Sequence, residues 1–233
     1  MKIFSEAIFI RKKKYLDNSV FVFYTKKSGL VELFVNTSQK NKNLNNLRPL
    51  SVLGLSFYKK GIHYKYLSHE NTVALFSIYE DFNKSCVVFF LSDFVYSICA
   101  KEDPNDDFFD FLKNSIIILE NSFLSISNFH ICFMIKCLYF VGFSPDLKKE
   151  DLYFDLKEGL SLNNKPLHYD FVNREEKNII LKLQNCKISS CHEVKIKKQE
   201  RKKIIETLIR FYKIHLHNFK KIKSHEILEE LFN

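Results

Sequence analysis

The sequence lacks any long uninterrupted hydrophobic run. Its two most apolar stretches, Cys86–Cys99 and Phe129–Phe143, are too short to cross a bilayer and are interrupted by Asp93 and Lys136. We therefore predict that both stretches are buried helices and that nothing crosses a membrane. The first residues do not resemble a signal peptide, because Glu6 breaks the apolar run and the basic cluster follows that run. A cytoplasmic location is the expectation.

Recognisable catalytic motifs are also missing. With only 5 Gly in 233 residues, the chain has no glycine-rich phosphate loop. A serine nucleophile elbow and a His-Glu-x-x-His metal motif are absent as well. The carboxylate pairs Asp106-Asp107 and Glu175-Glu176 do not suggest a metal site, because adjacent residues on a helix point apart. We therefore expect no enzymatic activity and no cofactor.

The six cysteines show no zinc-binding pattern. Cys186, Cys191 and His192 lie close together in the sequence. Structural zinc sites usually need two cysteine pairs spaced Cys-x2-4-Cys. Cys132 and Cys137 have this spacing, but they lie inside an apolar helical stretch, where residues five apart do not share a face. Without a signal peptide, reduced thiols are favoured over disulfides. We predict no bound metal and structural, buried thiols. The cysteines are Cys86, Cys99, Cys132, Cys137, Cys186 and Cys191.

The positive charge has a definite location. The chain has a formal net charge of +9, and residues 1–75 account for all of it with 13 Lys/Arg against 4 Asp/Glu. Residues 76–233 hold 23 residues of each sign. A basic module joined to a neutral remainder is typical of a protein that binds a polyanion through one part and other partners through the rest.

The same first 75 residues read as short strands, because apolar and polar residues alternate and Val, Ile, Phe and Tyr are frequent. A polar loop, Asn36–Leu47, separates the third strand from the fourth, and Lys59-Lys60-Gly61 marks a hairpin between the last two. Five short strands with one long loop predict a small, partly open barrel of the OB type, and an SH3-like barrel fits almost as well. The expected strands are Lys2–Ile10, Ser19–Tyr24, Leu30–Val35, Leu50–Tyr58 and Ile62–Leu75.

From Ile78 onward the apolar residues recur at helical spacing. Residues 146–172 form an irregular segment between these predicted helices. The fold class is therefore α+β, with a basic, nucleic-acid-binding barrel domain over 1–76 and an all-helical domain over 77–233. The expected helices are Ile78–Ala100, Asp106–Glu120, Ser127–Phe140, Asn173–Gln184, Lys197–Phe219 and Ser224–Phe232.

Several local patterns occur in a familiar order. They are the opening run Ala7–Val35 with Thr25 and Gly29 at its turn, Leu47-Arg48-Pro49-Leu50, Leu138–Asp146, Tyr153–Gly159 and His215–Leu231. Together they resemble the RecO family of bacterial DNA repair proteins over nearly the whole chain. The run Tyr153–Gly159 is similar to the zinc-free branch of that family found in Bacteroidota.

The resemblance implies an OB-fold followed by a helical domain. It also implies a recombination mediator without catalytic turnover, acting at the nucleoid. Such a protein binds single-stranded DNA, promotes strand annealing and helps to load recombinase. Its partners are a RecR-type protein and the acidic tail of the single-stranded-DNA-binding protein.

Basic residues and tyrosines are interleaved in the barrel region. At strand ends and in loops, a small barrel gathers such residues on one rim, where lysines track phosphates and tyrosines stack on bases. Single-stranded DNA is the expected ligand, with duplex DNA as a further possibility. The predicted contact residues are Arg11, Lys12, Lys13, Lys14, Lys26, Lys27, Lys40, Lys42, Arg48, Lys59, Lys60, Tyr15 and Tyr64.

A second basic run, Lys195–Lys223, has 11 Lys/Arg against 2 Glu. It is interpreted as a solvated helix face, a second DNA surface or a receptor for an acidic tail. Two other functions stay open: an adaptor that docks on acidic proteins, and a metal-dependent nucleic-acid enzyme using Cys186, Cys191 and His192. The candidate residues of the second surface are Lys198, Lys202, Lys203, Lys220, Lys221 and Lys223.

Overall fold

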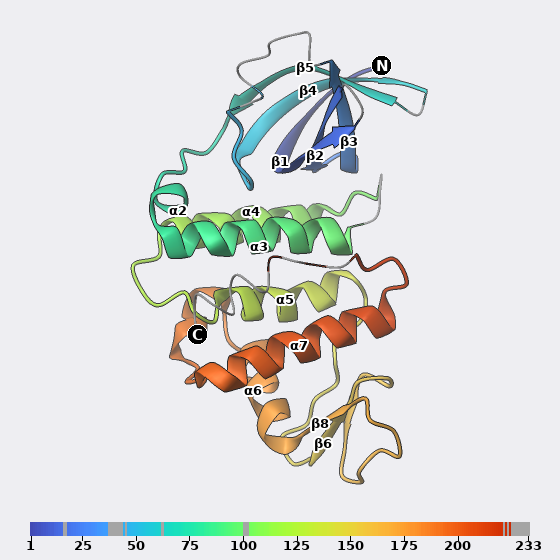
Figure 1. The fold of residues 1–233 in the computed structure, drawn as a ribbon, viewed down its shortest axis with the longest axis vertical. Helices are drawn as coiled ribbons and strands as arrows, with labels where there is room; N and C mark the ends of the chain where they lie inside the picture. Colours follow the sequence, from blue (N-terminus) through green and yellow to red (C-terminus); the bar gives the residue numbers. More distant parts are fainter. Residues whose placement is uncertain are drawn as a thin grey trace. The chain divides into compact units, whose positions relative to one another are not determined.

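The computed structural model describes residues 1–15, 18–36, 44, 46–61, 63–99, 103–220, 222 and 224. The chain divides into two compact units, Met1–Glu120 and Asn121–Asn233. The barrel therefore shares its unit with the helices that follow it (Figure 1). A separate domain ending at residue 76 stays a prediction. The predicted helix Ser224–Phe232 lies outside the described residues, except for Ser224 itself.

Five strands form a closed barrel in the first unit. Their order around the barrel is β1-β2-β3-β5-β4, and β1 closes the circle by pairing with β4. All neighbouring pairs are antiparallel except β3 and β5, which run parallel. This is the predicted OB-fold and not an SH3-like barrel. The strands are β1 (Lys2–Tyr15), β2 (Asn18–Thr25), β3 (Gly29–Asn36), β4 (Val52–Lys60) and β5 (His63–Asn71).

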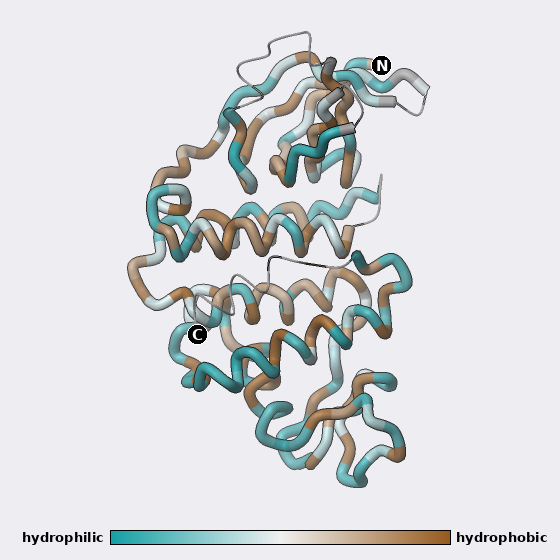
Figure 2. The backbone as a smooth tube through the Cα atoms, in the orientation of Figure 1, coloured by the Kyte–Doolittle hydropathy of each residue, from teal (hydrophilic) through white to brown (hydrophobic). Residues whose placement is uncertain are grey.

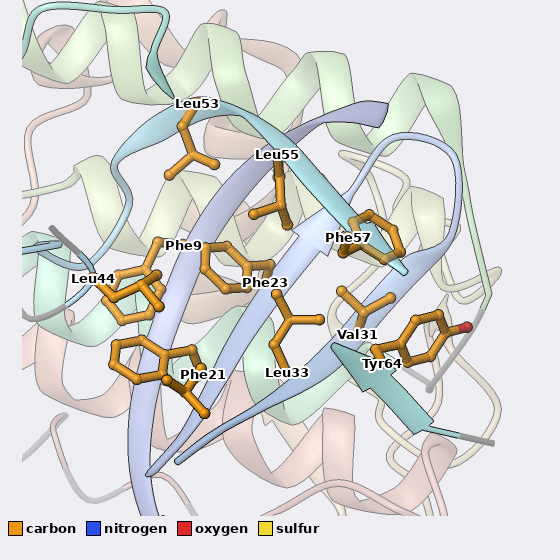
Figure 3. Packing of buried hydrophobic residues seen from close by; sticks show 12 residues of the cluster. Phe9, Phe21, Phe23, Val31, Leu33, Leu44, Leu53, Leu55, Phe57 and Tyr64 are labelled. Atoms are coloured by element: carbon orange, nitrogen blue, oxygen red, sulfur yellow. The ribbon is translucent and has the colours of Figure 1, made fainter. Parts of the chain in front are cut away.

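Alternate residues of each strand fill the barrel (Figure 3). On β2, Phe21 and Phe23 point inward, and the Phe9 ring from β1 lies 6.0 Å and 5.3 Å from them. Leu33 from β3 and Phe57 from β4 complete the packing. Burying such large apolar side chains is the main force that holds a domain of this size together.

Strand β1 is longer than the sequence pattern predicts. The expected strand ends at Ile10, but pairing with β2 continues to Tyr15. The register shifts between Phe9 and Arg11, so Ile10 is the extra residue of a β-bulge. The basic stretch that follows was expected to be a loop, because lysines do not alternate with apolar residues there.

Three helices follow the barrel in the first unit: α2 (Ser77–Glu80), α3 (Phe82–Ile98) and α4 (Asp106–Glu120). The expected helix Ile78–Ala100 is broken at Asp81, whose side chain accepts a hydrogen bond from the Lys84 N–H and starts α3. In Figure 1, α3 and α4 both lie below the barrel. The Tyr24 ring of β2 packs edge-on against Phe108 of α4 at 5.2 Å, so the outer face of β2 is buried.

In the part of the second unit that the structure describes, three longer helices and a short 3₁₀ helix, η1 (Ile188–Glu193), pack with a small sheet. The longer helices are α5 (Phe129–Phe140), α6 (Arg174–Asn185) and α7 (Lys198–His215). Short hydrophobic and hydrophilic stretches follow one another along α7 (Figure 2), as in an amphipathic helix, where apolar residues recur every three or four positions. The Tyr212 hydroxyl of α7 donates a hydrogen bond to the Met134 carbonyl of α5 at 2.7 Å. Among the described residues, no helix combines the length and hydrophobicity needed to cross a bilayer.

The segment expected to be irregular contains a three-stranded sheet of order β7-β6-β8. The strands are only three residues long, β6 (Tyr153–Asp155), β7 (Leu160–Leu162) and β8 (Phe171–Asn173), too short to show a period in the sequence. The buried Lys177 of α6 ties this region together. Its ammonium donates to the carbonyl oxygens of Lys148, Lys149 and Asp151 at 2.5–3.3 Å.

Candidate nucleic-acid interface

The predicted contact residues Arg11–Lys14 lie in the C-terminal half of strand β1 and not in a loop. In the register with β2, Arg11 and Lys13 lie opposite Val22 and Val20, whereas Lys12 lies opposite Phe21. Opposite residues share a face of the sheet, so the four cations divide between two faces. They do not form one continuous rim.

Arg11 and Lys13 are held by neighbouring side chains. Arg11 forms an ion pair with Asp93 of α3 at 3.2 Å, and its guanidinium lies 5.2 Å from the Tyr96 ring. Lys13 pairs with Glu32 of β3 at 2.8 Å and also hydrogen-bonds the Tyr96 hydroxyl. These charges are compensated within the first unit, so a phosphate must compete for them.

Lys26 is compensated in the same way. It donates to both carboxylate oxygens of Asp110 on α4, at 2.8 Å and 2.9 Å. The hydrogen bond with Asp110 raises the pKa of Lys26. The pair lies at the surface, where solvent screens the attraction, so its net contribution to stability is small. Three of the predicted contact cations thus face carboxylates rather than open solvent.

Other predicted cations are more accessible. Lys12, Lys14, Lys27 and Arg48 are exposed, and Lys59 is partly exposed. The Lys12 ammonium lies 5.3 Å from the Phe21 ring, and the Lys59 ammonium lies 5.1 Å from the Tyr64 ring. These cation–aromatic contacts hold the long side chains near the barrel while leaving charge at the surface.

Tyr64, by contrast, is buried, whereas a side chain that stacks on a base is expected to be exposed. It is only 6% exposed and belongs to the barrel core, where its ring meets Phe57 edge-on at 5.6 Å. A ring packed in this way has no free face for a base. The pairing of Tyr64 with Leu33, which belongs to the barrel core, explains why the Tyr64 ring points inward. Lys40 and Lys42, and the side chains of Tyr15 and Lys60, lie outside the described part of the structure.

Two exposed aromatic side chains of the barrel are not among the predicted contact residues: Tyr58, one of the interleaved tyrosines of the barrel region, and Phe34. Phe34 of β3 is 39% exposed and Tyr58 of β4 is 41% exposed. Each follows a buried residue, Leu33 and Phe57, and therefore points away from the barrel interior. Strict alternation around the buried residues is the signal that identifies them.

The second basic surface lies on and after α7. Lys198, Lys202, Lys203 and Lys220 are exposed, and Lys221 and Lys223 lie outside the described residues. Lys203 also lines a groove of about 420 Å³. That groove has mixed charge, since Arg210, Glu176 and Glu206 line it too. Inside it, the Thr207 hydroxyl donates to the Glu176 carboxylate, and burial raises the pKa of Glu176.

The cysteines singled out as zinc candidates lie in the second unit. Cys186 follows α6, and its sulfur is 3.9 Å from that of Cys132 on α5. Cys191 and His192 belong to η1. Throughout the described part of the chain, no three His, Cys, Asp or Glu side chains are grouped so that they could hold a metal ion. All six cysteines are free thiols.

The comparisons with known proteins bear on the whole chain. Residues 79–225 match the family model described as "Recombination protein O C terminal". The chain is 31% identical to the DNA repair protein RecO of Flavobacterium johnsoniae and 30% identical to that of Flavobacterium psychrophilum, over the full length of both partners. It is 29% identical to the RecO protein of Azobacteroides pseudotrichonymphae over 98% of each chain.

The chain belongs to the RecO family. The resemblance seen in the sequence is therefore confirmed, as is the predicted barrel followed by helices. The family model covers the helical part and begins at the end of the barrel region, within α2. The relatives match the barrel part as well, because their similarity extends over the entire chain.

Proposed function

We propose that this RecO-family protein binds single-stranded DNA through its barrel and promotes the annealing of complementary strands during DNA repair. The observation that carries the proposal is an OB barrel within residues 1–75, which hold 13 Lys/Arg against 4 Asp/Glu. OB barrels suit single strands because grooves on them accept a backbone and stackable bases. The relatives are named DNA repair proteins, which favours DNA over RNA.

The helical part supports a second role, docking of partner proteins. We propose that it works with a RecR-type protein to load recombinase. The exposed cations of α7 suit the acidic tail of a single-stranded-DNA-binding protein, because lysines make charge-assisted contacts with carboxylates. This division of labour gives each unit of the chain its own charged ligand.

An annealing assay tests the proposal. Two complementary oligonucleotides, one labelled with a fluorophore and one with a quencher, are mixed with and without the protein. We expect the protein to accelerate annealing, and replacing the exposed Lys12, Lys14 and Lys27 by Glu to weaken the effect at moderate salt, because each replacement makes the barrel surface less positive. The same replacements at Lys157, Lys165 and Lys182 of the second unit serve as a control. An annealing rate equal to that of DNA alone would refute the proposed function.

A further inference from the structure

The register of four strands places four particular residues in one line across the barrel. Lys2 of β1 lies opposite Tyr58 of β4. Tyr58 lies opposite Lys65 of β5, and Lys65 lies opposite Phe34 of β3. We call Lys2, Tyr58, Lys65 and Phe34 the outer row. Neighbouring strands are about 4.8 Å apart, so the row spans roughly 14 Å.

All four side chains point away from the barrel core. Their neighbours in the sequence, Phe57, Tyr64 and Leu33, point into the barrel in Figure 3 and are at most 6% exposed. Because successive side chains of a strand point to opposite faces, the outer-row residues lie on the outer face. They are accordingly exposed, Tyr58 by 41% and Phe34 by 39%.

The row alternates a cation with an aromatic ring, Lys-Tyr-Lys-Phe. Single-stranded nucleic acids are bound by this combination, since lysines neutralise phosphates while rings stack on bases without reading their identity. The two rings lie two β-strands, or about 10 Å, apart. A DNA strand that follows the row therefore meets the Tyr58 ring between the two lysines and the Phe34 ring beyond Lys65. Beyond Phe34 the line continues to Val20 of β2 and Lys13 of β1.

Acidic residues limit the row on one side. Four positions further along β1, Glu6 lies opposite Gly54 of β4, which lies opposite Glu70 of β5. Glu6 is held by Lys113 of α4 at 2.6 Å, whereas Glu70 is exposed. A phosphate backbone is repelled by these carboxylates and attracted by Lys2 and Lys65. Among the described residues, the outer row is therefore a more favourable line for a polyanion than the line through Glu6 and Glu70.

We infer that the outer row is the path of single-stranded DNA over the barrel. Bases stack on Tyr58 and Phe34, and phosphates lie against Lys2 and Lys65. The inference rests on the proposed function and adds a route for it, running directly across β4 and β5. It departs from the basic half of β1, where Arg11 and Lys13 already face carboxylates.

The absence of tryptophan makes the row directly observable. A Tyr58→Trp variant carries a single tryptophan in the outer row, and a Phe82→Trp variant carries one on α3, where Phe82 is 71% exposed. Both are titrated with an oligodeoxythymidine of about 20 nucleotides. We expect the emission of the Tyr58→Trp variant to be quenched on binding, because a base stacks on the ring. The emission of the Phe82→Trp variant should stay unchanged.

Alanine variants measure how much the rings contribute. Removing a stacking ring weakens binding by about 5- to 100-fold per base contact. We expect losses in this range for Tyr58→Ala and Phe34→Ala and none for Phe82→Ala, with Tyr58→Phe retaining the affinity. Thermal unfolding of each variant checks that the barrel is intact.

The outcomes separate the row from the function. If the unmodified protein binds no oligonucleotide, the proposed function fails. If it binds, but the Tyr58→Trp emission does not change and the folded alanine variants bind as well as the original, the DNA follows another route and the outer row is refuted. Quenching together with weakened alanine variants supports both.

Discussion

Single side chains in this protein acquire their roles from strand parity. Tyr58 and Tyr64 are both tyrosines in a basic hairpin, but one is 41% exposed and the other 6%. Composition alone does not separate them, and the sequence reasoning chose Tyr64. Anchoring the alternation on the buried Phe57 assigns Tyr58 to the outer face, so this part of the site was predictable from the sequence. The ion pair of Arg11 with Asp93 was not, because 82 residues separate the partners.

The carboxylate of Glu120, at the end of α4, binds the start of α2. It accepts hydrogen bonds from the backbone N–H groups of Phe76, Ser77 and Ile78 at 2.9–3.0 Å. Burial acts to raise the pKa of Glu120, but these three N–H groups outweigh it and the pKa lies below its ordinary value of 4.5. The ionised form is therefore the one that the fold prefers.

This preference makes a pH-dependent prediction. Because the folded-state pKa of Glu120 is depressed, its stabilisation is complete above pH 4.5 and is lost as the pH falls through the folded-state value. We expect Glu120→Gln to lower the free energy of unfolding by about 1–2 kcal/mol at pH 7 and by less at pH 3. Urea unfolding at both pH values measures the difference. Glu80→Gln, at an exposed position of α2, is the control, and an equal loss at both pH values would contradict the assignment.

Strands and helices follow the sequence where their period is long enough to see. Helix α4 spans Asp106–Glu120 as predicted, and strands β2 to β5 lie within four residues of their expected ends. Strands β6, β7 and β8 were not predicted, because a strand of three residues is too short to show an alternation of apolar and polar residues. The extension of β1 to Tyr15 escaped because its pairing with β2, not its composition, makes it a strand.

The contacts between barrel strands and helices α3 and α4 predict how binding responds to charge removal. Asp93 and Asp110 compensate Arg11 and Lys26. Replacing both aspartates by asparagine frees two cations with little loss of stability, since solvent screens ion pairs at the surface. We expect tighter binding of oligodeoxythymidine and a log–log salt slope steeper by up to about 1.4.

Anisotropy titrations over a salt series measure this change, and thermal unfolding confirms that the variant is folded. Glu80→Gln/Asp107→Asn, which removes the same charge at exposed positions of α2 and α4, is the matched control. An equal or larger gain in that control would show that overall charge, and not release of Arg11 and Lys26, determines the affinity.

Over the full chain, the net charge is distributed more evenly between the two compact units than between residues 1–75 and 76–233. Residues 76–120 hold 3 Lys/Arg against 9 Asp/Glu, so the unit that contains the barrel has a net charge of +3, and the unit 121–233 has +6. The surplus of the first 75 residues is therefore partly offset by the helices packed beside it. What remains for a polyanion is a local arrangement of exposed cations, and this depends on register rather than on net charge.

The most direct test of that conclusion is the salt dependence of binding to single-stranded DNA. Neutralising about 5 phosphates gives a slope of roughly −3.5 in a plot of log affinity against log salt concentration. A variant with Lys2→Glu and Lys65→Glu loses two of these contacts, and we predict a slope of roughly −2.1 together with weaker binding. Slopes that are the same for the original protein and the variant would contradict the assignment of Lys2 and Lys65 to the DNA path.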